Sequence, residues 1–235
     1  MTTTIAVCTT RAGQTSTSWA VSVAWTLAAT RTVALVDCDM EGGTIADLLY
    51  LPLGDRSIAN CLGERQATPP ELDAQSIPVP GRPRLRVVPG LRGTFGFDIV
   101  ECLRRVGGAM RGLDYGTVVA DLGHPLSHPG LRSPRAAADA ICSTFARVFV
   151  VLRDEPALVS RSLDVLRGAR MRRGEVVICE QRGRALQRLL AESLRRELPD
   201  LSLRRGWSWD ESRAARAADS GRPVVMAGID RDLSL

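Results

Sequence analysis

The chain of 235 residues contains no lysine, so all 31 of its basic residues are arginines. This absence matters most for phosphate chemistry. A standard P-loop uses a lysine to reach the β- and γ-phosphates of a bound nucleotide. Any phosphate site in this chain must therefore work without that lysine.

Long apolar runs and processing signals are also missing. No run of about 18 apolar residues is present to span a membrane, and no basic segment followed by an apolar one indicates secretion. Residues 228–235 are too short and too acidic for an amphipathic membrane helix. The six cysteines form no C-x-x-C pair, and His124 and His128 lack the spacing of metal ligands. We therefore expect a cytoplasmic protein with reduced thiols.

Strand and helix patterns alternate along the chain. The expected strands cover 4–9, 32–38, 84–88, 115–121, 147–152, 174–180 and 201–205. The expected helices cover 17–29, 96–111, 133–143, 155–171, 183–197 and 209–220. Valine-rich apolar strands that alternate with helices predict an α/β fold, with a doubly wound, mostly parallel sheet and helices on both faces. We expect one domain over 1–235, with an irregular, proline-rich connection at 67–83.

The segment Thr9–Ser18 lies where a phosphate-binding loop is expected. It follows the apolar strand Ile5–Cys8 and precedes a buried helix pattern. A small-residue loop between a strand and a helix N-terminus cradles anions, because free N–H groups and the helix dipole point at the ligand. The P-loop pattern G-x-x-x-x-G-K-[ST] aligns with Thr10–Thr17 and retains only the final hydroxyl residue. Thr10 and Thr15 replace its glycines and Ser16 replaces its lysine.

The order of several motifs resembles the ParA/MinD family. Arg11–Ala20 resembles that family's loop, K-G-G-V-G-K-T-T-L-A. The run Val33–Asp39 is similar to its hydrophobic strand ending in D-x-D, and Tyr115–Gly123 is similar to the strand with the Walker B aspartate. Ala215–Val225 resembles its closing A-x-x-x-G-x-P-V segment. The resemblance covers nearly the whole chain and implies a P-loop NTPase fold.

The resemblance also implies roles for individual residues. The nucleotide-binding positions are Arg11, Ala12, Gly13, Gln14, Thr15, Ser16, Thr17 and Ser18. Thr17, Asp37 and Asp121 match positions that hold Mg²⁺ or its water shell. Asp39 matches the residue that orients the attacking water, and Arg11 the one that reaches across a homodimer to the partner's phosphates. For Asp37 and Asp39, capping of the turn after the strand is the structural alternative.

The loop substitutions indicate weakened nucleotide chemistry. Ser16 supplies no charge against a triphosphate, and Thr10, Ala12 and Thr15 add Cβ atoms where glycines would allow close approach. ATP and Mg²⁺ are therefore expected to bind weakly, with an empty site an equally plausible alternative. The loop resembles that of the CpaE/TadZ branch, whose members position secretion or pilus machinery. This likeness implies a positioning factor, a homodimer and a protein partner from a secretion, pilus or partition system.

Two alternatives remain open from the sequence. The first is a slow ATPase of plasmid or chromosome partitioning that binds DNA without sequence preference, because residues 153–235 carry 17 arginines and 13 acidic residues, a net charge of +4. The second is an adaptor that binds no nucleotide. The candidate DNA contacts are Arg195, Arg196, Arg204, Arg205, Arg213, Arg216 and Arg222. A solvated arginine-rich face explains the same residues without DNA, because glutamates interleave with them.

Overall fold

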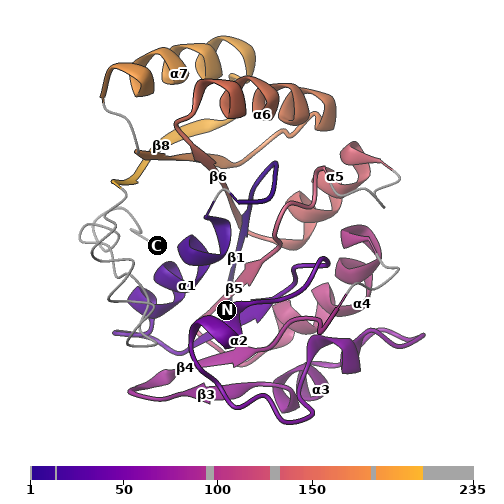
Figure 1. Cartoon of the computed structure of the whole chain (residues 1–235). Coiled ribbons are helices and arrows are strands. Elements are labelled where there is room, and N and C mark those ends of the chain that lie inside the picture. Colours follow the sequence, from indigo (N-terminus) through magenta and orange to yellow (C-terminus); the bar gives the residue numbers. More distant parts are fainter. Residues whose placement is uncertain (1, 14, 94–97, 128–132, 181–183, 209–235) are drawn as a thin grey trace.

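A computed structural model of the chain describes residues 2–13, 15–93, 98–127, 133–180 and 184–208. Strands and helices alternate along them (Figure 1). The strands are β1 (Thr3–Cys8), β2 (Val33–Asp37), β3 (Ile77–Val79), β4 (Arg82–Val88), β5 (Thr117–Asp121), β6 (Arg147–Arg153), β7 (Glu175–Glu180) and β8 (Ser202–Ser208). The helices are α1 (Ser16–Leu27), α2 (Ile45–Leu48), the 3-10 turn η1 (Ile58–Cys61), α3 (Pro69–Ala74), α4 (Ile99–Gly112), α5 (Pro134–Thr144), α6 (Pro156–Ala169) and α7 (Arg184–Glu197).

The strands form one eight-stranded sheet in the order β3-β4-β2-β5-β1-β6-β7-β8. Every neighbouring pair is parallel except β3 with β4 at one edge. Because β1, β2, β5, β6 and β7 run in one direction, their carboxyl ends meet along the same edge of the sheet. Ligands of open α/β sheets bind outside this edge.

The sheet is covered on both faces. Along β1, Ala6 and Cys8 belong to a core that includes residues of α4, α5, α6 and α7, whereas Ile5 and Val7 belong to a core built with α1 and α2. Figure 1 shows α1 on one side of β1 and β5, and α4 and α5 on the other. Strands buried on both faces explain the continuous apolar runs of the sequence.

The predicted α/β fold, with its mostly parallel sheet and helices on both faces, is confirmed. Each predicted strand and each predicted helix up to residue 197 is present, with ends that differ by up to three residues. The predicted helix 209–220 lies outside the described residues. Within the part of the chain that the structure describes, no helix is both long and apolar enough to cross a bilayer.

The prediction of an irregular connection at 67–83 is wrong. This segment contains α3 and β3. Thr68 and Glu71 form a capping box, and Pro69 occupies the first turn of α3, where a missing N–H costs nothing. Pro78 lies in β3 at the edge of the sheet, where proline is tolerated. The prolines were therefore compatible with both elements.

Candidate functional site

The loop between β1 and α1 contains two left-handed residues. Gly13 has a φ of 77° and Thr15 a φ of 65°. Glycine adopts this conformation freely, but it strains a β-branched side chain. The carbonyl of Thr15 accepts the N–H of Trp19 at 3.0 Å, so Thr15 is also the N-cap of α1. Thr15 therefore has the left-handed backbone conformation that is typical of glycine.

The threonines of the loop tie it to neighbouring elements. Thr10 is fully buried, and its hydroxyl donates to Oγ of Ser162 on α6 at 2.6 Å. The hydroxyl of Thr15 lies 4.0 Å from Sγ of Cys179 on β7. At the tip, Nη1 of Arg153 donates to the carbonyl of Gly13 at 3.3 Å. The residues that replace the P-loop glycines therefore make contacts that glycines could not make.

The remaining loop positions differ in exposure. Ser16, at the position of the family lysine, is 6% exposed. Ala12 and Gly13 are exposed, Arg11 and Ser18 are partly buried, and Gln14 lies outside the described residues. The loop itself therefore presents backbone groups, hydroxyls and the arginine at position 11.

Thr17, in the first turn of α1, meets Asp121 at the end of β5. The Asp121 carboxylate accepts hydrogen bonds from the Thr17 hydroxyl and from the Gly123 N–H, the latter to Oδ1 at 3.2 Å. Burial raises the pKa of Asp121 to about 6, although these two hydrogen bonds lower it, and the charge of Asp39 adds a smaller upward effect. Its other oxygen, Oδ2, is buried without a hydrogen-bond partner among the described residues.

This pair fits a magnesium site. Mg²⁺ binds oxygen ligands and keeps several waters, which a second carboxylate oxygen can hold. The hydroxyl of Thr17 and the unpartnered Oδ2 of Asp121 supply two such oxygens beside the loop. The described residues contain no cluster of three or more histidine, cysteine or acidic side chains that could hold a metal alone. Thr17 and Asp121 therefore fit a metal ion that is also bound by a phosphate ligand.

Asp37, at the end of β2, is placed differently. Its carboxylate accepts the Asp39 N–H at 3.3 Å and the Ile45 N–H at 3.1 Å, and its side chain is almost fully buried. A Cβ on Gly43 would lie 2.5 Å from Oδ2 of Asp37 and 2.5 Å from Cα of Gly90. The two glycines therefore enclose the carboxylate, and this geometry favours the capping alternative over a metal role.

Burial, and to a smaller extent the nearby charge of Asp121, raise the pKa of Asp37 to about 8. The two backbone hydrogen bonds act in the opposite direction. The sheet thus holds two buried carboxyls close enough to influence each other.

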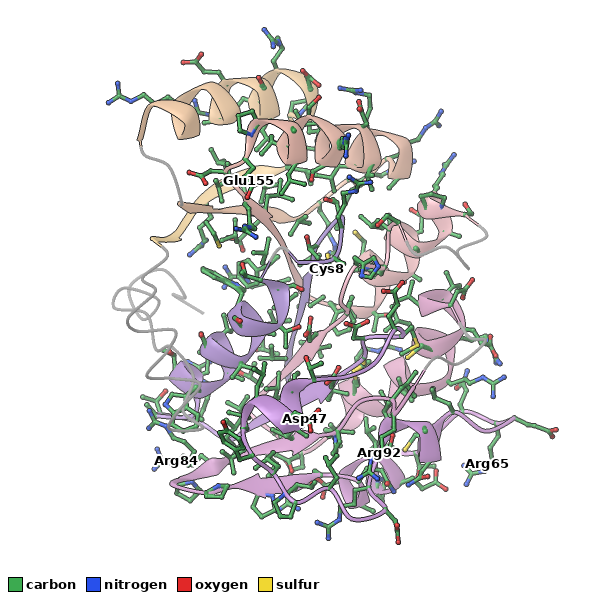
Figure 2. All side chains as sticks on the ribbon, in the orientation of Figure 1. Cys8, Asp47, Arg65, Arg84, Arg92 and Glu155 are labelled. Atoms are coloured by element: carbon green, nitrogen blue, oxygen red, sulfur yellow. The ribbon has the colours of Figure 1, made fainter. Side chains whose placement is uncertain are left out.

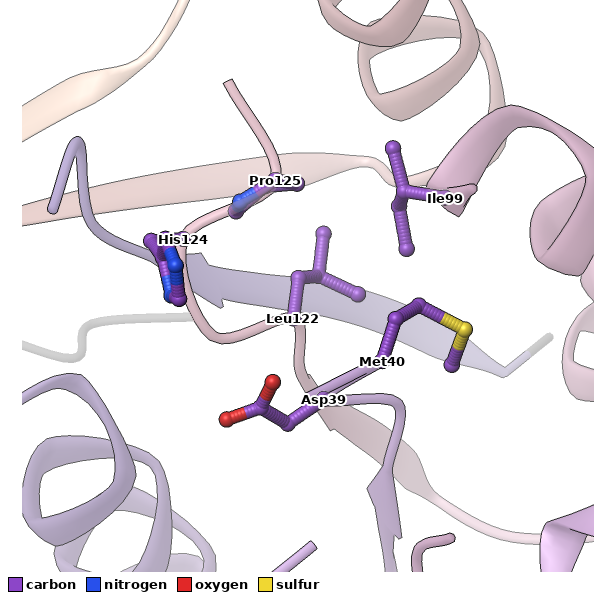
Figure 3. A pocket seen from close by; sticks show the side chains of 6 residues that line it. All are labelled: Asp39, Met40, Ile99, Leu122, His124 and Pro125. Atoms are coloured by element: carbon purple, nitrogen blue, oxygen red, sulfur yellow. The ribbon is translucent and has the colours of Figure 1, made fainter. Parts of the chain in front are cut away.

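Asp39 lines a small pocket. Met40, Ile99, Leu122, His124 and Pro125 form the other walls (Figure 3). A Cβ on Gly123 would lie 2.6 Å from Cγ of Asp39, so the glycine lets this carboxylate approach the loop after Asp121. The Asp39 carboxylate also accepts the Glu41 N–H at 3.0 Å. Asp39 is partly exposed, as a residue that orients water must be.

His124 was not predicted to take part in this site. Its Nε2 lies 3.1 Å from Oε1 of Glu41, which connects the loop after β5 to the loop after β2. In the sequence, only its position three residues after Asp121 indicates that His124 could belong to the site, because its partner Glu41 is far away along the chain. His124 and Asp39 line the same pocket (Figure 3).

The candidate DNA contacts are not brought together as one described surface. Arg195 and Arg196 are exposed in the last turn of α7. Arg204 instead donates to Oε2 of Glu175 at 2.6 Å, and Glu175 also pairs with Arg147. The side chain of Arg205 and the whole of Arg213, Arg216 and Arg222 lie outside the described residues.

The comparisons with solved structures concern the fold that positions these residues. The chain is similar to a ParA family ATPase from Chlorobium tepidum TLS, with a TM-score of 0.71, 14% identity, and 95% of this chain and 90% of that chain covered. For the MinC:MinD cell division protein complex of Aquifex aeolicus, the TM-score is 0.68, with 16% identity and coverage of 96% and 88%. For the septum site-determining protein MinD of Pyrococcus horikoshii OT3 with Mg-ADP, they are 0.61, 12%, 95% and 88%.

No protein-family model and no curated protein matches the sequence. At these identities the structural similarity establishes the fold alone. The chain has the fold of the ParA and MinD ATPases, and the elements that form its candidate site are β1, α1, β2 and β5.

Proposed function

We propose that this chain is a ParA/MinD-like protein with a degenerate nucleotide site, which acts as a positioning or assembly factor like members of the CpaE/TadZ branch. The observation that carries the proposal is the pairing of Thr17 with Asp121, whose Oδ2 is buried and has no hydrogen-bond partner in the part of the chain that the structure describes. A metal-type site is thus retained beside a loop in which Ser16 replaces the lysine. The site binds adenine nucleotide weakly and hydrolyses ATP slowly or not at all.

Each residue has a distinct part in this proposal. The N–H groups of the loop and of the first turn of α1 hold the phosphates, and Thr17 and Asp121 hold Mg²⁺ and its water. When bound, Mg²⁺ neutralises charge on the phosphate oxygens. Asp39, partly exposed at its pocket, orients water. Arg11 reaches the phosphates of a second copy in a homodimer.

The cargo of such a factor is a protein assembly. Solved structures of the same fold include MinD in complex with MinC, and MinD with Mg-ADP. These structures support a protein that binds nucleotide and presents a surface to a protein partner. For this chain we propose a partner from a secretion, pilus or partition system.

Restoring the lysine tests the nucleotide part of the proposal. We expect Ser16→Lys to bind Mg·ATP about ten- to a hundredfold more tightly than the natural chain, because it adds one charge-assisted phosphate contact. Calorimetric titration of both proteins measures the difference. Ser143→Lys, which adds the same charge at an exposed position of α5, should leave the affinity unchanged.

One result of these measurements would contradict the proposal. Micromolar binding of Mg·ATP by the natural chain, with turnover that disappears in Asp39→Ala, would overturn the degenerate-site proposal. It would favour the second candidate, a slow partitioning ATPase. The exposed Arg195 and Arg196 on α7 support that candidate, because they could contact DNA phosphates.

A further inference from the structure

An arginine from another strand contacts the tip of the loop between β1 and α1. Arg153 is the last residue of β6, and β6 pairs directly with β1, with Cys8 opposite Val150. The carboxyl ends of both strands therefore lie at the same edge of the sheet. From this position Nη1 of Arg153 donates to the carbonyl of Gly13 at the tip of the loop, at 3.3 Å.

The same guanidinium contacts a carboxylate. Its Nη2 lies 3.4 Å from Oε1 of Glu155, and the two side chains are 30% and 33% exposed. Glu155 stands just before α6, in the upper part of Figure 2. An ion pair in contact with solvent is held weakly, so an incoming anion can replace Glu155. A guanidinium donates charge-assisted hydrogen bonds to phosphate, so the nitrogen that faces Glu155 can donate to a phosphate oxygen once Glu155 is replaced.

A second feature of this edge points to the same ligand. Asp121 presents a buried, unpartnered oxygen next to Thr17, which fits a cation bound with a polyphosphate. The loop that carries Gly13 leads directly into the helix turn that carries Thr17. A polyphosphate held by that turn lies against the loop whose tip Arg153 contacts.

We propose that Arg153 is the phosphate-binding cation of this site and takes the place of the lysine that is absent at position 16. Its ligand is the polyphosphate of a nucleoside di- or triphosphate, with Glu155 as the partner that it leaves on binding. This inference rests on the proposed nucleotide site and adds to it the residue that supplies a positive charge for the phosphates. It also assigns a role to a residue that no P-loop motif contains, since Arg153 comes from β6.

Calorimetric titration with Mg·ADP and with inorganic tripolyphosphate tests the proposal. We expect Arg153→Gln to raise the Kd for both ligands by about tenfold or more, because a charge-assisted contact is lost. Arg153→Lys keeps the charge and should stay within about threefold of the natural chain. Arg104→Gln is the matched control, since Arg104 is an exposed arginine paired with Glu101 on α4, and it should change neither Kd.

The outcomes separate this inference from the proposed function. If the natural chain binds Mg·ADP and Arg153→Gln binds equally well or better, the role of Arg153 is overturned and the nucleotide site stands. If the natural chain binds neither ligand at millimolar concentration, both are overturned. Should Arg153→Gln fail to fold by circular dichroism, Glu155→Gln decides. That change removes the carboxylate that competes with the phosphate for Arg153, and it is expected to lower the Kd about threefold. An unchanged or higher Kd contradicts the proposal.

Discussion

The hydroxyl of Thr10 donates a hydrogen bond to Ser162 at 2.6 Å and thereby connects the loop after β1 to α6. Both side chains are fully buried. Ser162 in turn donates to the carbonyl of Leu158 at 2.7 Å, one turn earlier in the helix. The position at which a P-loop has its first glycine is therefore part of the packing between the loop and α6. The substitution anchors the loop where a glycine would leave it free.

Removing this bond should destabilise the protein. Thr10→Val keeps the shape of the side chain and removes its donor, and we expect the free energy of unfolding to fall by about 1 kcal/mol. Urea unfolding measures the change, and Ser162→Ala combined with Thr10→Val gives the coupling between the two. Thr44→Val, at an exposed threonine whose side chain makes no capping hydrogen bond, is the control. Additive effects of the two changes would mean that the hydrogen bond contributes nothing.

Thr15→Gly should have the opposite effect. A threonine in the left-handed region costs roughly 1–2 kcal/mol, and the extra freedom of glycine in the unfolded chain offsets about half of this. We therefore expect the free energy of unfolding to rise by about 0.5–1 kcal/mol. Thermal unfolding measures the change. Thr26→Gly, inside α1, is the contrasting variant, because glycine in a helix is destabilising. Destabilisation by Thr15→Gly would show that the contact with Cys179 outweighs the strain.

Part of this site could be predicted from the sequence, because motif spacing reports where strands end. Thr17 follows the first strand and Asp121 ends a later one, and parallel strands bring such ends together. The sequence could not show that Asp37 accepts the Ile45 N–H, since that depends on how the chain folds back after β2. It likewise could not show the contact of Arg153 with Gly13, which are 140 residues apart.

The missed elements have a local cause. The prolines between Ala67 and Pro83 suggested irregular structure, but a proline in the first turn of a helix removes no hydrogen bond. The Thr68–Glu71 capping box is a sequence signal for α3 that outweighs them. The fold as a whole was more predictable, because strands buried on both faces require continuous apolar runs.

Stability should fall as pH rises, because of the buried carboxyls. Folding raises the pKa of Asp121 to about 6 and that of Asp37 to about 8, whereas an unfolded aspartate has a pKa of about 3.9. The folded state therefore holds more protons between pH 4 and 8. The contribution of these two carboxyls to the stability of the folded state is therefore complete below about pH 4, and it is lost as pH rises through the folded pKa values.

Asp121→Asn tests this relation. We expect the variant to be more stable than the natural chain at pH 8 by on the order of 1–3 kcal/mol, and about equal to it at pH 4. Urea unfolding across this range measures both, with Asp139→Asn, at an exposed aspartate of α5, as the control. A difference between variant and natural chain that does not depend on pH would contradict the assigned cause.

Arg11 provides a test of the dimer. If it reaches the phosphates of a second copy, Arg11→Ala should weaken self-association in the presence of Mg·ATP while the fold stays intact. Light scattering over a range of concentrations measures the mass of both proteins. Arg56→Ala, a change at an exposed arginine outside the loop, should leave association unchanged. Identical masses of natural chain and Arg11→Ala under all conditions would make Arg11 a surface residue only.

Binding of DNA should be weak and sensitive to salt. Of the candidate contacts that the structure describes, Arg195 and Arg196 are exposed, whereas Arg204 is held by Glu175. Few phosphates can then be neutralised at once, so binding to random duplex should disappear near physiological salt through counterion release. Fluorescence anisotropy at low and moderate salt measures it. Arg195→Gln with Arg196→Gln should remove the binding that exists.

Arg204→Gln should instead lower the stability of the folded protein. It removes one of the two arginines that pair with Glu175, so the free energy of unfolding should fall by about 1 kcal/mol or less, since these side chains remain in partial contact with solvent. Affinity for DNA should stay the same. Tight, salt-resistant binding that is lost when Arg204 and Arg205 are changed would contradict this assignment, because it would require Arg204 to leave Glu175 for a phosphate. Such a result would favour the partitioning ATPase over the positioning factor.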